Sequence, residues 1–212
     1  MGAPGHIALL GDSIFDNGYY VPGEPSVADQ VRAALPGGWE TTLLAVDGAS
    51  ASDVRAQLER IGAEVTHLFL SAGGNDALNE SSILTERVAS VAEAEHVVAR
   101  AQARFRREYE ELVSSILAVG KPAVLCTVYD AIPNLGEPAR VALTAFNDVI
   151  LRTAFRNHTP VIDLRLVCDE DSDYSVVSEI EPSAHGGAKI AQVVADVATS
   201  HDFTSRRAVV YP

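Results

Sequence analysis

Three loops of this 212-residue chain carry residue types that could act on a carbonyl group. Ser13 follows Gly11 and Asp12 directly after an apolar run, so its hydroxyl can project into a crevice at the end of a strand. Gly48, in a second loop, lets a backbone N–H approach a ligand closely. The amide of Asn75, in a third loop, is a good neutral donor for a developing oxyanion. A helix cap or a turn would explain each residue singly, whereas the three in succession form a much more specific pattern.

These loops follow the first three strands of a chain in which strands and helices alternate. Strands are expected at 7–10, 41–46, 66–71, 123–128 and 160–164, and helices at 27–35, 54–61, 85–119 (one or two helices), 138–155 and 182–199. This alternation predicts parallel βαβ units in an α/β fold, with Pro182 in the first turn of the last helix. We expect one domain over residues 1–200 and a C-terminal tail over 201–212. In such sheets a ligand binds beyond the carboxyl ends of the strands, where all three loops lie.

The Gly-Asp-Ser, the glycine of the second loop and the Gly-Asn-Asp of the third resemble the SGNH (GDSL) hydrolases, a family of esterases, lipases and acyltransferases. The resemblance runs from about residue 7 to 191. It implies a three-layer α/β/α sandwich with a flavodoxin-like, five-stranded parallel sheet in the order 2-1-3-4-5. It also implies that Ser13 is the nucleophile and that an oxyanion hole is formed by the N–H groups of Ser13 and Gly48 and the amide of Asn75. Asp12 and Asp76 match positions that brace these loops.

The sequence departs from the family at the general base, which a serine needs because its free hydroxyl is a poor nucleophile. The family supplies Asp-x-x-His, often followed by Pro, shortly before the last helix. Here Glu181 precedes Pro182 where the histidine would stand, and Ser178 takes the place of the aspartate. Three interpretations remain open: Glu181 is the base, with its pKa raised by burial; His185, one helical turn onward, is the base and Glu181 orients it; or the site lacks a base.

Composition excludes several other functions. Lys and Arg number 16 against 29 Asp and Glu, for a formal charge of −13, which disfavours binding to nucleic acid. Two cysteines, Cys126 and Cys168, cannot build a disulfide framework, and no histidine or cysteine spacing indicates a metal site. No segment has the length and apolar character of a membrane span or a signal peptide, so we expect a cytoplasmic protein.

The sequence therefore predicts a serine esterase that hydrolyses small carboxylic esters through an acyl-Ser13 intermediate, without a metal or an organic cofactor. The alternative is a catalytically weak or inactive domain that binds an ester-like ligand in the same pocket. The partner in either case is a small-molecule ester, and the sequence leaves the oligomeric state open.

Overall fold

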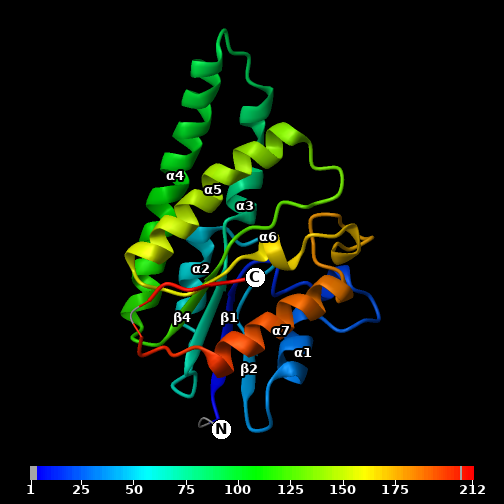
Figure 1. The fold of residues 1–212 in the computed structure, drawn as a ribbon, viewed down its shortest axis with the longest axis vertical. Coiled ribbons are helices and arrows are strands. Elements are labelled where there is room, and N and C mark those ends of the chain that lie inside the picture. The colour runs from blue at the N-terminus through cyan, green and yellow to red at the C-terminus, as the bar shows by residue number, and fades with distance from the viewer. Residues whose placement is uncertain (1–3, 206) are drawn as a thin grey trace.

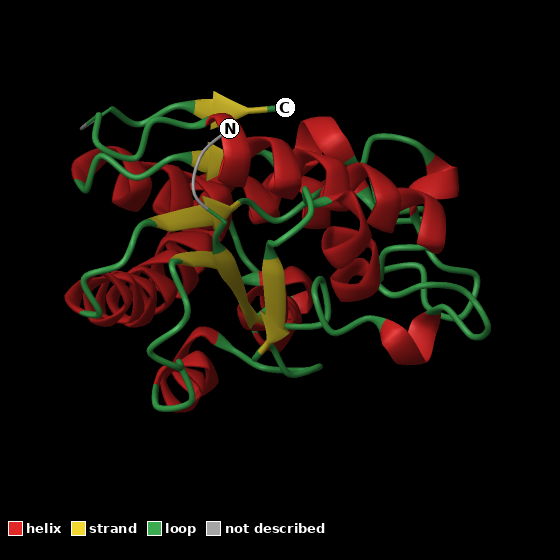
Figure 2. Cartoon of the chain, turned by 90° about the horizontal axis from the view of Figure 1, so that it is seen from below, coloured by secondary structure: helices red, strands yellow, loops and turns green. Residues whose placement is uncertain are grey.

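Six short parallel strands form the centre of the fold in the computed structural model, which describes residues 4–205 and 207–212 (Figures 1 and 2). The strands are β1 (His6–Gly11), β2 (Glu40–Leu43), β3 (His67–Ser71), β4 (Ala123–Cys126), β5 (Val161–Ile162) and β6 (Val210–Tyr211). Their order in the sheet is β2-β1-β3-β4-β5-β6. The order of the first five strands confirms the order predicted from the resemblance, and the sheet belongs to the expected α/β class.

Helices cover both faces of the sheet, so side chains that alternate along each strand are buried on both sides. Ile7 and Leu9 of β1 face one core and Ala8 and Leu10 face the other. The first core is closed by α1 (Val27–Ala34), α6 (Leu164–Val167) and α7 (Ala184–Ser200). The second core is closed by α2 (Ala51–Leu58), α4 (Val91–Ala118) and α5 (Glu137–Arg156). The short α3 (Gly74–Asn79) and the 3-10 turns η1 (Gly18–Tyr20), η2 (Ser81–Thr85) and η3 (Asp171–Asp173) complete the connections.

The last helix, α7, begins later than predicted. The Ser183 side chain caps it by accepting a hydrogen bond from Gly186 N–H (3.1 Å), so the first helical residue is Ala184. Pro182 is not in the first turn, because it forms an isolated antiparallel bridge with Tyr174. Glu181 therefore lies outside the helix that carries His185, and the helical spacing expected between these two side chains does not exist.

A sixth strand corrects the predicted count of five. β6 lies within residues 201–212, which the sequence indicated only as a tail, and pairs Val210 with Val161 and Tyr211 with Ile162. Two further backbone hydrogen bonds support it, from Val161 N–H to the Val209 carbonyl and from Asp163 N–H to the Tyr211 carbonyl, both 2.8 Å. The tail thus covers the edge of β5 that would otherwise be unpaired.

Candidate active site

Ser13 is held in a tight turn at the carboxyl end of β1. Gly11 has a φ of +121°, and a Cβ atom there would lie 1.7 Å from the Ser71 carbonyl oxygen of β3, so only glycine fits. Asp12 N–H donates to the same carbonyl (3.1 Å). The Asp12 carbonyl accepts from Phe15 N–H (3.2 Å), which closes the turn around Ser13. The close approach of β1 and β3 places Ser13 at the mouth of the sheet, with 7% of its surface exposed.

One cavity of about 190 Å³ brings together three of the residues predicted from the sequence. Ser13, Asn75 and Glu181 all line it, as does Asp12. They come from the ends of β1 and β3 and from the segment before α7, which are far apart in the chain and adjacent at this edge of the sheet. Most of the other lining residues are apolar. The arrangement supplies a hydroxyl, an amide donor and a carboxyl group in a largely apolar pocket.

Glu181 is buried next to the Ser13 hydroxyl. Only 5% of its surface is exposed, and its Oε2 atom has no hydrogen-bond partner. Burial raises the pKa of Glu181 from 4.5 to about 7. The nearby Ser13 side chain lowers this pKa and the charge of Asp47 raises it, both to a smaller extent. The carboxyl group can therefore take up or release a proton near neutral pH, which an ordinary surface glutamate cannot do.

The segment that carries Glu181 is anchored through three successive carbonyl groups. The Ile180 carbonyl accepts a hydrogen bond from the Tyr129 hydroxyl (2.7 Å), and the Glu181 carbonyl accepts one from Ser175 N–H (2.8 Å). The Pro182 carbonyl accepts from the side-chain amide of Asn17 (3.1 Å). We call these three bonds the carbonyl clamp. It holds the backbone of Glu181 from three different segments of the chain.

Sequence reasoning did not identify Asn17 and Tyr129 as parts of the site. Both lie in loops at the carboxyl end of the sheet, and that location is the only sequence signal for them. Asn17 is fully buried, and its oxygen also accepts from Val27 N–H at the start of α1 (2.8 Å). Tyr129 is buried and lines the cavity.

The amide of Asn75 is oriented by the loop that contains Gly48. Its nitrogen donates one hydrogen to the Ala49 carbonyl (3.1 Å), which leaves a second amide hydrogen for a ligand in the cavity. Gly48 itself is exposed and has a φ of +79°. It lines a separate shallow hollow beside Asp47 and Ala49, and it is not among the residues that line the cavity with Ser13.

The two aspartates predicted to brace the loops make backbone contacts there. Asp12 accepts a hydrogen bond from Ile14 N–H (3.2 Å), and burial raises its pKa to about 7. Asp76 accepts from Ala51 N–H, the first residue of α2, at 3.0 and 3.3 Å from its two oxygens. Burial raises the pKa of Asp76 to about 6. Asp12 thus supports the turn that carries Ser13, and Asp76 connects the segment after β3 to the start of α2.

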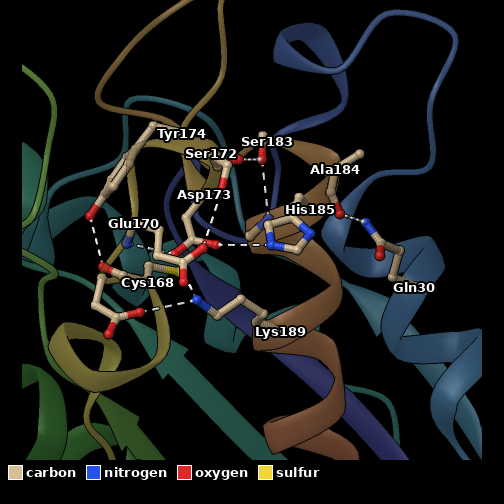
Figure 3. A network of polar contacts seen from close by, with 12 residues as sticks. Gln30, Cys168, Glu170, Ser172, Asp173, Tyr174, Ser183, Ala184, His185 and Lys189 are labelled. Carbon is tan, nitrogen blue, oxygen red and sulfur yellow. Dashed lines mark hydrogen bonds and ion pairs between the residues drawn. The ribbon is translucent and has the colours of Figure 1, made fainter.

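His185 is not among the residues that line the cavity, and its ring lies beside Asp173 (Figure 3). Its Nε2 atom lies 3.8 Å from Oδ1 of the buried Asp173, and 61% of its side chain is exposed. Asp173 is held on its other oxygen by Lys189 Nζ (2.8 Å). Because α7 begins only at Ala184, the structure does not bring His185 to Ser13.

Neither a metal centre nor a membrane helix is found in the part of the chain that the structure describes. Over residues 4–205 and 207–212, no group of three or more His, Cys, Asp or Glu side chains is arranged to hold a metal ion. Over the same residues, no helix is both long enough and apolar enough to cross a bilayer.

Comparison with known proteins places this geometry in context. A model of the GDSL-like lipase/acylhydrolase family matches residues 9–199. No curated protein sequence matches the chain. An extracellular lipase from Streptomyces rimosus has a similar structure, with a TM-score of 0.67 and 20% identity over 93% of this chain and 100% of the lipase. A lipase from a goat rumen metagenome has a TM-score of 0.70 and 19% identity, over 90% of this chain and 95% of the lipase. An acetyl xylan esterase from Geobacillus stearothermophilus has a TM-score of 0.63 and 18% identity, over 90% of this chain and 93% of the esterase.

Proposed function

Because the chain belongs to the GDSL-like lipase and acylhydrolase family, we propose that it is a serine esterase in which Glu181 replaces histidine as the general base. One observation carries the proposal: the Ser13 hydroxyl meets a buried carboxyl group, with a pKa of about 7, in the cavity that also contains the Asn75 amide. A base titrating near the working pH is best placed both to accept a proton and to return it.

In the proposed reaction, the Ser13 hydroxyl oxygen attacks the ester carbonyl carbon and its proton passes to the Glu181 carboxylate. The Asn75 amide and the Ser13 backbone N–H stabilise the negative oxygen that forms. Glu181 then gives its proton to the alcohol oxygen, the bond between that oxygen and the carbonyl carbon breaks, and the acyl group stays on Ser13. Water, deprotonated by Glu181, attacks this acyl group; collapse of the intermediate returns the proton to Ser13 and releases the acid. Gly48 is given no role here because it lies outside the cavity lining.

The unpartnered Oε2 of Glu181 supports this role. A buried carboxylate oxygen without a hydrogen-bond donor is costly for a protein to maintain, and such groups occur at sites where they serve a reaction. In the resting enzyme the cost is limited because the group is mostly protonated below neutral pH. Deprotonation at higher pH produces the carboxylate that can accept the Ser13 proton as the hydroxyl oxygen attacks the ester.

Hydrolysis of 4-nitrophenyl esters by the purified protein tests the proposal, with Ser13→Ala as the matched control. We expect turnover in the wild type, loss of turnover in Ser13→Ala, and covalent labelling of Ser13 by a fluorophosphonate. Hydrolysis that survives in Ser13→Ala would refute the mechanism. An absence of both turnover and labelling in the folded wild type would show that the domain binds its ligand without reacting with it.

A further inference from the structure

Part of the lining of the cavity that contains Ser13 and Asn75 comes from α3, η2 and α5. The apolar residues of this part include Leu78 of α3, Ile83 and Leu84 of η2, and Ala139, Ala142 and Leu143 of α5. These elements lie together on one side of the molecule, away from α1 and α7 (Figure 1). We use the name acyl arm for the space between these six residues.

The charges around the acyl arm disfavour an anionic occupant. The charged residues that line the whole cavity in the described structure are Asp12, Glu80 and Glu181, and no Lys, Arg or His lines it. Glu80, the one beside the arm, is occupied by Arg104, which reaches both of its oxygens at 2.7 and 2.5 Å. A carboxylate or phosphate in the arm would therefore lose its hydration without gaining a counter-ion. An aliphatic chain would instead replace water along apolar walls.

The reaction geometry decides which part of an ester enters the arm. The alcohol oxygen must face Glu181, which protonates it, and the carbonyl oxygen must face Asn75. Glu181 stands on the segment before α7, whereas the arm is built from α3, η2 and α5. With the alcohol directed towards Glu181, the acyl substituent of the same carbon is directed into the arm.

We infer that the acyl arm selects neutral esters with an aliphatic acyl chain of several carbons, a preference that rests on the esterase function proposed above. The arm is finite, because Leu78 and Leu84 at its edge are partly exposed to solvent. A chain that reaches these two residues fills the arm, and further carbons extend into water. Selectivity therefore rises with chain length and then reaches a plateau.

The first test varies the acyl group at constant alcohol, with 4-nitrophenyl acetate, butyrate, hexanoate and octanoate. Burying a methylene at about 0.8 kcal/mol corresponds to a gain in kcat/KM of about fourfold, or on the order of 100-fold from acetate to hexanoate. The 4-nitrophenyl monoester of adipic acid, which ends in a carboxylate, should lose this gain. A hexanoate-to-acetate ratio near one in the active enzyme would overturn the inference. So would a preference that follows the alcohol when alkyl acetates are compared.

The second test blocks the arm. Ala142→Trp should lower the hexanoate-to-acetate ratio of kcat/KM by at least about 10-fold, because the indole occupies the space of the chain. Val141→Trp is the matched control, since Val141 is on the same helix, 68% exposed and outside the cavity lining, and its ratio should stay unchanged. Ala139→Trp, one helical turn earlier, provides a second blocking variant if Ala142→Trp does not fold. Folded blocking variants with an unchanged ratio would overturn the inference.

The two proposals fail in different ways. Failure to hydrolyse any ester in the series, together with no labelling of Ser13, would remove the esterase function and the arm with it. Hydrolysis of 4-nitrophenyl acetate that depends on Ser13 but gains nothing from longer acyl chains would leave the esterase function intact and reject the arm alone.

Discussion

The pH dependence of the reaction is a direct test of the carboxylate at Glu181. Since only the ionised carboxylate can take the proton of Ser13, kcat/KM should fall towards acid with unit slope and a midpoint of about pH 7, the raised pKa of Glu181. Substrates without titrating groups, such as 4-nitrophenyl esters measured from pH 5 to 9, report this midpoint for the free enzyme. Asp12, whose pKa is also about 7, faces the same cavity, so Asp12→Asn is needed to show that the midpoint belongs to Glu181.

The size of the pH effect on kcat/KM follows from the raised pKa of Glu181. At pH 5, two units below a pKa of about 7, about 1% of Glu181 is ionised, so kcat/KM should be about 100-fold below its alkaline plateau. A glutamate with the ordinary pKa near 4.5 would be mostly ionised at pH 5 and would lose less than about twofold. Glu181→Gln keeps the shape of the side chain and removes the base, and we expect it to lower kcat by about 10²- to 10⁴-fold.

A histidine base would give a similar fall of kcat/KM towards acid, so the assay must distinguish a carboxylic acid from an imidazolium. Added ethanol raises the pKa of a neutral carboxylic acid, because ionisation creates charge, but it scarcely changes that of a cationic imidazolium. We therefore expect the midpoint of the kcat/KM pH profile to rise in ethanol. We expect His185→Gln to retain both the rate and the fall of kcat/KM towards acid. The reasoning would be refuted by a midpoint near 4.5, or by a rate that survives in Glu181→Gln and is lost in His185→Gln.

Three further predictions concern the surroundings of the site. Tyr129→Phe removes one bond of the carbonyl clamp and should lower kcat by about 10-fold. Tyr174→Phe is the control: it removes a 3.0 Å bond to the Cys168 carbonyl, outside the clamp, and should cost only about 1 kcal/mol of stability in urea unfolding. The raised pKa of Asp12 makes the folded protein hold a proton that the unfolded chain loses near pH 4, so stability should fall as pH rises from about 4 to 7. Asp12→Asn should recover up to about 4 kcal/mol at pH 8 and little at pH 4, measured by the same unfolding; equal effects at both would contradict the shift. Gly11→Ala should destabilise the fold by more than about 3 kcal/mol, because its Cβ would clash with the backbone of Ser71. Gly48→Ala should cost only about 1 kcal/mol, because its Cβ would meet nothing within 4 Å and only the positive φ of +79° would be unfavourable.

Local signals in the sequence were enough to predict five strands and the place of Ser13 after the first of them, whereas the strand order was predicted from the resemblance to the SGNH hydrolases. The apolar runs are short and bounded by glycine, and the residues after β1 and β3 follow them directly in the chain. Residues 210–211 carried no comparable signal, because a strand of two residues has no periodicity and its partner β5 lies about 50 positions earlier. The strand count was therefore short by one.

The choice between Glu181 and His185 could not be made from the sequence because it depends on where α7 begins. Proline is favoured in a first helical turn, and this preference predicted that Pro182 belongs to the helix. The bridge between Pro182 and Tyr174 and the cap at Ser183 decide otherwise. The clamp could not be predicted either, because its side-chain bonds join residues 51 and 165 positions apart, for which propensity has no information.

Asn17 has a consequence for how this molecule can diversify. It stands on the same loop as Ser13 and binds the carbonyl next to Glu181, so the two residues proposed to react are tied together within one local unit. Most walls of the acyl arm belong to η2 and α5, whose side chains make no hydrogen bond to Ser13, Asn17 or Glu181 in the part of the chain that the structure describes. Substitutions in η2 and α5 can therefore change which substrate is accepted while the spacing of the two reacting groups stays constant. Redesign of selectivity can be confined to these two elements.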